Sequence, residues 1–223
     1  MIMLYHCVAA RSFRPLWALE ELGLPYQLKV LAFPPRALDR AYLDINPLGT
    51  VPTLLDGALR MTESAAICHY LGVQYGPSEL VAGAHEPDFG VFLNWLHFGE
   101  ATLTFPLTII LRYERFEPEA RRLPQAAEDY RRWFLGRLKT LEPLLAKQDH
   151  MCCGRFTMAD ISVGYALLLA EYLGMAAAFP PPVQRYLERL KLRPAFQRAC
   201  TAERSGAEAQ GISATPAPLL GAP

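Results

Sequence analysis

The pattern of apolar and polar residues divides the chain into two parts. Met1 to His6 is a short apolar run and Tyr26 to Leu31 alternates apolar with polar residues, so each predicts a strand. Between them, leucines at three-residue steps predict a helix from Arg11 to Leu22. From Pro87 onward the apolar residues recur at helical spacing. The pattern therefore indicates a mixed α/β region followed by an all-helical one.

Residues 46–71, NPLGTVPTLLDGALRMTESAAICHYL, contain the strongest local signals. A proline that opens an apolar run donates no ladder hydrogen bond, which favours a cis peptide between Val51 and Pro52. Asp56-Gly57 between two apolar runs predicts a β-hairpin. A helix then follows Glu63 and Ser64. With a short helix predicted from Arg36 to Leu43, the order becomes β-α-β-α-β-β-α, which is the thioredoxin-like arrangement.

Breaks in this pattern suggest the domain boundaries. Gly76-Pro77-Ser78 ends the last helix of the first region, and the small and polar residues that follow suit a linker. The tail is rich in Ala, Gly and Pro, a composition typical of disorder. We predict a thioredoxin-like domain over 1–76, a linker over 77–86, an all-α domain over 87–201 and a disordered tail over 202–223.

Two features define the helical domain. One long helix begins near Phe89 and is expected to bend or end near Pro106. The run FTMADI, residues 156–161, matches a capping box in which Thr157 caps a helix and Asp160 reaches back to it. We therefore interpret Asp160 as structural rather than catalytic.

Composition excludes several classes of function. The chain has 22 basic and 22 acidic residues, so nothing points to nucleic acid or to an anionic membrane surface. The apolar N-terminus lacks a basic leader, and no run is long enough to span a bilayer. Five cysteines without paired spacing suit a reducing compartment, and no histidine spacing suggests a metal site. We expect a cytoplasmic protein that uses no metal.

The motif NPxGxVPxLxD followed by ESxAIxxYL resembles the glutathione-binding half of the soluble, bacterial-type glutathione transferases. The resemblance extends to FTMADI and to the closing helices. It implies that the backbone of Val51, before Pro52, pairs with the cysteinyl residue of glutathione. It also implies that Glu63 and Ser64 hold the γ-glutamyl end, and that the protein is a homodimer.

The residue that ionises the glutathione thiol is harder to place. A free thiol has a pKa of about 8.5, and members of the family lower it with a Ser, Cys or Tyr between the first strand and the first helix. The usual serine and cysteine positions fall on Ala9, Ala10 and Arg11. Ser12 is the nearest hydroxyl and our first candidate; its alternative role is to cap the helix. Tyr5 is the second candidate.

The resemblance leaves the reaction partly open. The leading hypothesis is conjugation of the glutathione thiolate to a hydrophobic electrophile, with Trp95, His97 and Phe98 as candidate residues of the acceptor pocket. Isomerisation, dehalogenation, ether cleavage or disulfide reduction would use the same thiolate. A non-catalytic glutathione-binding or regulatory relative is the third hypothesis, which the alanines at Ala9 and Ala10 keep open.

Overall fold

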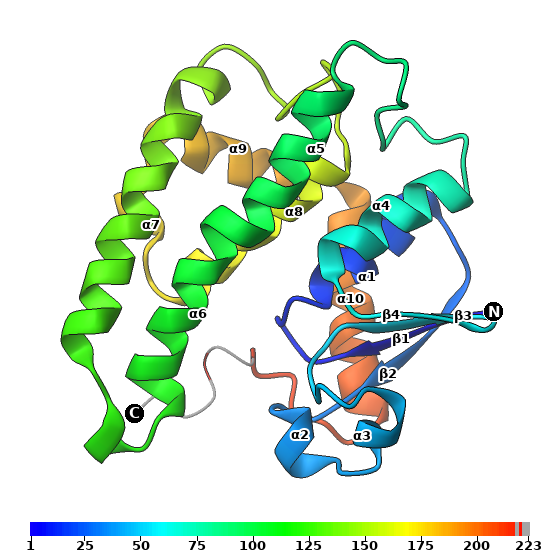
Figure 1. Ribbon diagram of the computed structural model, residues 1–223, viewed down its shortest axis with the longest axis vertical. Helices are drawn as coiled ribbons and strands as arrows, with labels where there is room; N and C mark the ends of the chain where they lie inside the picture. Colours follow the sequence, from blue (N-terminus) through cyan, green and yellow to red (C-terminus); the bar gives the residue numbers. More distant parts are fainter. Residues whose placement is uncertain (217–218, 220–223) are drawn as a thin grey trace. The chain divides into compact units, whose positions relative to one another are not determined.

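The computed structural model describes residues 1–216 and 219 of the 223 in the chain. Its contacts group the described residues into two units, one of 1–78 with 192–216 and one of 79–191 (Figure 1). The last helix therefore belongs with the N-terminal unit, whereas the sequence suggested that it closes the helical domain. No helix among the described residues is long and apolar enough to cross a membrane.

The N-terminal unit is built on a four-stranded mixed sheet with strand order β2-β1-β3-β4. Strand β1 is parallel to β2 and antiparallel to β3, and β3 pairs with β4 across the Asp56-Gly57 turn. Gly57 has a φ of 59°, as the predicted hairpin requires. This confirms the thioredoxin-like prediction. The elements are β1 (Ile2–His6), α1 (Phe13–Leu22), β2 (Tyr26–Val30), α2 (Pro35–Leu38), α3 (Tyr42–Ile45), β3 (Thr53–Asp56), β4 (Leu59–Met61), α4 (Ser64–Gln74) and α10 (Pro194–Ala209).

Helix α1 packs against both α4 and α10. Its residues from Phe13 to Leu19 are all buried, because two helices and the sheet cover it. The single helix predicted from Arg36 to Leu43 is instead two four-residue helices, α2 and α3. Asp39 separates them because its backbone, with φ of −137° and ψ of 87°, leaves the helical region.

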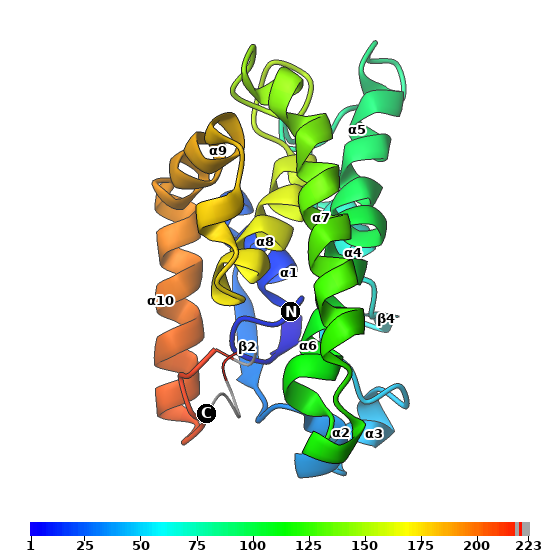
Figure 2. The same cartoon turned by 90° about the vertical axis from the view of Figure 1, so that its left-hand side faces the viewer.

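The prediction of a disordered tail from 202 is wrong up to Ala209, where α10 ends. Figure 2 shows α10 alongside the edge strand β2, and the two elements are in contact. A Cβ on Gly206 would lie 3.2 Å from side-chain atoms of Leu28 and Val30, so the small residue allows a close approach. The alanines and the glycine thus serve helix formation and packing rather than disorder. Residues 217, 218 and 220–223 of the predicted tail lie outside the described residues.

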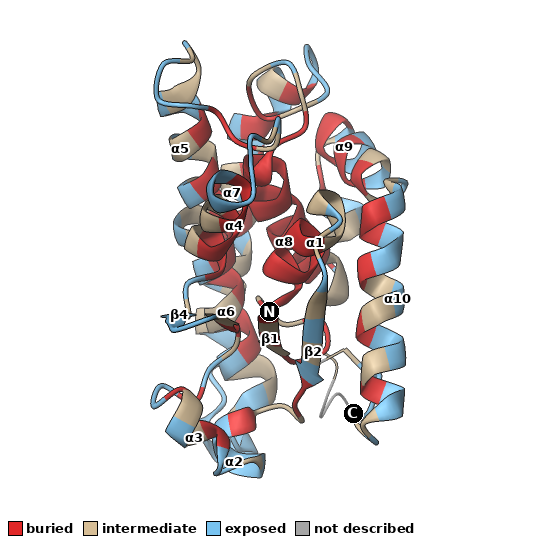
Figure 3. Cartoon of the chain, turned by 90° about the vertical axis from the view of Figure 1, so that its right-hand side faces the viewer, coloured by how far each residue is buried: buried red, intermediate tan, exposed pale blue. Residues whose placement is uncertain are grey.

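The second unit is a helical bundle around α8. Almost all of α8 is buried, as its colour in Figure 3 shows, and α5, α6, α9 and the π-helical turn η1 contact it. Helix α7 packs on α6 and α9. The elements are α5 (Phe89–His97), η1 (Phe98–Thr104), α6 (Phe105–Leu111), η2 (Arg112–Phe116), η3 (Glu119–Arg121), α7 (Pro124–Leu145), α8 (Met158–Tyr172), η4 (Ala176–Ala178) and α9 (Pro181–Lys191).

The long helix does not end at Pro106 but changes its winding before it. Residues Phe98–Thr104 are π-helical, and Pro106 lies in the first turn of the α-helix that follows. Pro106 donates no backbone hydrogen bond, which favours such a local change. Thr104 Oγ1 donates to the carbonyl of Gly99 at 2.7 Å within this turn.

The predicted capping box is confirmed at the start of α8. Thr157 Oγ1 accepts from the Ala159 N–H at 3.3 Å, and the Thr157 N–H donates to Asp160 Oδ2 at 2.8 Å. Asp160 Oδ1 also accepts from the Met151 N–H at 2.9 Å and the Tyr186 hydroxyl at 2.8 Å. All of its contacts are therefore structural, as the sequence suggested.

Candidate functional site

The turn before β3 contains the predicted cis peptide between Val51 and Pro52. Pro52 is buried and Val51 is half-buried. The next residue, Thr53, begins β3 and lies opposite Tyr5 of β1 in the antiparallel register. Two predicted site residues, Tyr5 and Val51, therefore belong to neighbouring segments of the same unit.

Two polar residues that the sequence analysis did not assign hold this turn. The buried Tyr42 hydroxyl donates to the Thr50 carbonyl at 2.6 Å and lies 2.6 Å from Thr53 Oγ1. Asn46 Nδ2 donates to the same Thr50 carbonyl at 2.8 Å. Because these bonds act on both sides of Val51, they fix the direction of its backbone. Asn46 opens the NPLG motif, so the sequence did contain a signal for one of them.

The start of α4 brings Ser64 beside a buried cation. Ser64 is 3% exposed, and its Oγ accepts from Arg14 Nη1 of α1 at 3.1 Å. Arg14 is 0% exposed. Glu63, in the cap position, is exposed and makes no capping bond from its side chain. Helix N–H groups and a guanidinium at one point favour a bound carboxylate, which is what the γ-glutamyl end of glutathione presents.

The structure does not place Ser12 where a ligand can reach it. The Ser12 hydroxyl accepts from the Cys7 N–H at 3.2 Å and donates to the Cys7 carbonyl at 3.4 Å, and the residue is 0% exposed. Ser12 occupies the cap position of α1, as the alternative role expected, but its side chain makes no capping hydrogen bond. Contact between Ser12 and a thiolate stays a prediction, and it requires the hydroxyl to leave the Cys7 backbone.

In the loop from Cys7 to Ser12, only Ala10 and Arg11 are partly exposed. Ala10 belongs to a small cluster that also includes Tyr5 and Val51. The Tyr5 ring is half-buried and tilted by 38° against the Tyr42 ring, at a centroid distance of 5.4 Å. The cluster packs these residues against the buried side chains of Cys7, Leu31 and Tyr42.

Cys7 itself does not fit a redox role. Burial raises the pKa of its thiol to about 12, so the thiolate needed for disulfide exchange is scarce near neutral pH.

The acceptor-pocket candidates are all in the second unit. Trp95 and Phe98 are half-buried, and their rings meet edge to face at 5.0 Å. His97 is exposed. His97 and Phe98 line a shallow depression of about 340 Å³ over α5 and η1, together with Leu93, Asn94, Ala101 and Thr102. Trp95 is not among its lining residues, so the three candidates do not form one pocket wall.

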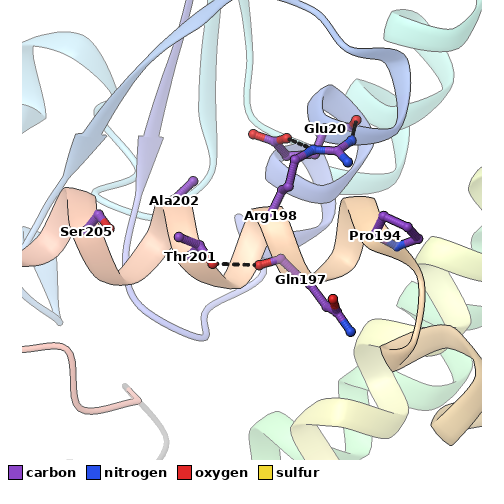
Figure 4. A pocket seen from close by; sticks show the side chains of 7 residues that line it. All are labelled: Glu20, Pro194, Gln197, Arg198, Thr201, Ala202 and Ser205. Carbon is purple, nitrogen blue, oxygen red and sulfur yellow. Dashed lines mark hydrogen bonds and ion pairs between the residues drawn. The ribbon is translucent and has the colours of Figure 1, made fainter.

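A larger surface groove, of about 550 Å³, lies between α1 and α10 (Figure 4). It contains none of the predicted site residues. Arg198 on its wall is bound to Glu20, with Nε 2.9 Å from Oε2 and Nη2 donating to the Glu20 carbonyl at 2.7 Å. The two charged residues that line the groove, Arg198 and Glu20, therefore bind each other and attach α10 to α1.

Comparison with known proteins gives a consistent result. The family model for the glutathione S-transferase N-terminal domain matches residues 10–74, which include Ser12, Val51, Pro52, Glu63 and Ser64. Glutathione S-transferase 4 of Zea mays is 30% identical over 191 residues, which cover 83% of this chain and 85% of that protein. Glutathione S-transferase 3 of Schizosaccharomyces pombe is 38% identical over 103 residues, 46% of this chain and 43% of that protein.

Solved structures extend the likeness over most of the chain. A glutathione transferase from Methylococcus capsulatus has a TM-score of 0.80 and 26% identity, covering 91% of this chain and 98% of its own. A sphingomonad glutathione S-transferase complexed with glutathione has a TM-score of 0.78 and 28% identity, covering 90% of this chain and 98% of its own.

Proposed function

The chain belongs to the cytosolic glutathione transferase superfamily, and on this premise we propose that its N-terminal unit binds glutathione and activates the thiol for attack on a hydrophobic electrophile. The observation that carries the proposal is the Arg14–Ser64 pair at the start of α4, in the same unit as the Val51–Pro52 turn. The two features suit the γ-glutamyl end and the cysteinyl residue of the tripeptide. Ser64, Val51 and Pro52 are also residues that the family resemblance assigns to glutathione, whereas Arg14 is not among them.

In this proposal the γ-glutamyl carboxylate accepts hydrogen bonds from Ser64 and from the first N–H groups of α4. The guanidinium of Arg14 stabilises the negative charge behind Ser64. The exposed carboxylate of Glu63 attracts the γ-glutamyl ammonium group. The Val51 backbone, held by Tyr42 and its partners, pairs with the cysteinyl residue.

The reaction is a substitution at the electrophile. The thiol proton leaves to solvent, the thiolate sulfur forms a bond to the electrophilic carbon, and the leaving group departs with the bonding electron pair. Lowering the thiol pKa by about 2 units requires about 2.7 kcal/mol of preferential thiolate stabilisation. One charge-assisted hydrogen bond and the positive end of α1 are of this size together.

We propose Tyr5 as the hydroxyl that donates to the thiolate. Tyr5 is partly exposed and packs in the same cluster as Val51, whereas Ser12 has no exposed surface. Ser12 instead closes the loop through Cys7. Trp95, His97 and Phe98 stay the candidate residues for binding the electrophile.

The second candidate is a glutathione-binding protein without transferase activity. Ala9 and Ala10 occupy positions where family members carry a Ser or Cys, which favours this reading. A panel of aryl halides, epoxides, unsaturated carbonyl compounds and disulfides, assayed with and without glutathione, separates the two. Turnover with any of them supports an enzyme and its product identifies the reaction; glutathione binding without turnover supports the second candidate.

We also expect a cytoplasmic homodimer, as family membership suggests. Sedimentation at micromolar concentration should show particles of two chains. Particles of one chain would reject this part of the proposal.

A further inference from the structure

A buried carboxylate from the C-terminal helix reaches the loop that precedes α1. Glu203 of α10 is 8% exposed, and its Oε1 lies 2.8 Å from Nε2 of His6, the last residue of β1. The same oxygen accepts from the N–H of Ala9 at 2.7 Å. His6 is 0% exposed. One oxygen, 194 residues away in sequence from Ala9, therefore ties together the end of β1 and the loop.

The position of this contact matters because Ala9 has a φ of 56°. This left-handed conformation is unfavourable for an alanine, because its Cβ lies too close to the following carbonyl oxygen. A hydrogen bond from its N–H to a carboxylate offsets that cost. Ala10 and Arg11, the two partly exposed residues of the loop, follow directly in the chain. The backbone conformation of Ala9 therefore sets the direction in which the chain continues to Ala10 and Arg11.

Contacts along its length hold α10 in place. At its start, Arg193 binds Glu21 with Nε–Oε1 and Nη2–Oε2 distances of 2.6 and 2.8 Å. Just past its end, Gln210 donates to the Leu28 carbonyl at 3.1 Å and accepts from the Val30 N–H at 3.2 Å. Glu203 lies between these attachments. The carboxylate thus comes from a rigid element rather than from a loose terminus.

We propose that Glu203 is a positioning residue for the glutathione thiol: through His6 and Ala9 it holds the end of β1 and the loop in the arrangement that presents Tyr5, Ala10 and Arg11 to the sulfur. This inference rests on the proposed function. It adds that the C-terminal helix is part of the thiol site.

The hydrogen bonds also indicate whether the charge of Glu203 or the placement of its oxygen matters more. The carboxylate oxygen is an acceptor for two N–H groups, so an amide oxygen in the same place serves nearly as well. His6 Nδ1 is buried and has no hydrogen-bond partner among the described residues. A carboxylate oxygen can only accept a hydrogen bond, so Nε2 of His6 is the donor in this contact. The contact therefore depends on the reach and the placement of the acceptor, more than on its charge.

The test compares Glu203→Ala, Glu203→Asp and Glu203→Gln in the full-length protein. The pH midpoint of glutathione thiolate formation on the protein, followed by ultraviolet absorbance, is measured together with kcat/KM and a melting curve. Glu208→Ala is the control for charge, because Glu208 is exposed on the same helix. Arg198→Ala is the control for a weaker attachment of α10, because Arg198 binds Glu20 and not the loop.

We expect the alanine and aspartate variants to raise the thiolate midpoint by about one pH unit and to lower kcat/KM between about 10- and 100-fold, the usual cost of a small misplacement. Aspartate keeps the charge but is one methylene shorter, and it also remains informative if the alanine variant does not fold. The glutamine variant should stay near wild type.

Folded alanine or aspartate variants with a wild-type thiolate midpoint would overturn the inference. So would an equal shift in Arg198→Ala, because the effect would then come from the attachment of the helix. Failure of the wild-type protein to bind glutathione is a distinct result, which refutes the proposed function and this inference with it.

Discussion

Arg14 on α1 and Ser64 on α4 are joined by a 3.1 Å hydrogen bond although 50 residues separate them. The bond places a guanidinium that is 0% exposed behind the first residue of a helix. A guanidinium behind the first N–H groups of a helix adds positive charge at that point, which strengthens binding of an anionic ligand group there.

The first prediction concerns this pair. Ser64→Ala should weaken glutathione binding by about 1–3 kcal/mol, or roughly 5- to 150-fold, because one carboxylate oxygen and the Arg14 guanidinium both lose a partner. Arg14→Lys should weaken it as well, since an ammonium does not reproduce the fork of a guanidinium. Titration calorimetry on variants with wild-type circular dichroism measures both. Unchanged affinity in Ser64→Ala would refute the assignment.

The second prediction separates the two candidate hydroxyls. Tyr5→Phe should remove most of the thiolate absorbance of bound glutathione at pH 7 and slow turnover by about 10²–10³, the usual effect of losing one such donor. Ser12→Ala should mainly lower the melting temperature, because its hydroxyl binds the Cys7 backbone. The reverse outcome, with loss of thiolate in Ser12→Ala alone, would show that Ser12 leaves Cys7 when glutathione binds.

The third prediction concerns the support of the Val51 turn. Tyr42→Phe keeps the ring but removes the hydroxyl that joins Thr50 and Thr53. Leaving buried partners unsatisfied should destabilise the protein by about 1–3 kcal/mol and also weaken glutathione binding. Tyr130→Phe, in the second unit, is the matched control. Urea unfolding measures the stability and calorimetry measures the affinity for glutathione. A loss of stability without any change in affinity would show that Tyr42 does not support the glutathione site.

The fourth prediction concerns pH. Hydrogen bonds from the hydroxyls of Tyr75, at 2.6 Å, and Tyr70, at 2.8 Å, lower the pKa of Asp56. A lowered folded-state pKa means that the stabilisation is present above the unfolded value of about 4 and is lost as pH falls through the folded value. The double variant Tyr70→Phe/Tyr75→Phe should therefore be less stable than wild type at pH 7, with the gap narrowing at pH 3. A gap of constant size between urea unfolding curves at the two pH values would contradict this.

The sequence revealed mainly features with local causes. The Val51–Pro52 turn, the Asp56-Gly57 hairpin and the Thr157–Asp160 capping box each depend on residues close together in the chain, so their spacing alone predicted them. In each of these motifs, the residues that interact are only a few positions apart in the chain. That is why the fold class and these motifs were predicted in advance of the structure.

What the sequence did not reveal depends on pairs far apart in the chain. The partners Arg14 with Ser64 and His6 with Glu203 are 50 and 197 residues apart. Nothing local distinguishes Arg14 or Glu203 from a solvated charge on a helix surface. Glu203 was also missed because it falls in the segment predicted to be a disordered tail. The small residues that allow α10 to pack closely give that segment the composition of a disordered one.

The central claim is that the N-terminal unit holds glutathione, and titration calorimetry of the wild-type protein with glutathione tests it most directly. We expect one binding event per chain with a dissociation constant in the micromolar to millimolar range, and competition by S-methyl glutathione, which keeps both ends of the tripeptide. Absence of a binding signal at several millimolar glutathione, in a protein with the expected circular dichroism, would contradict the account.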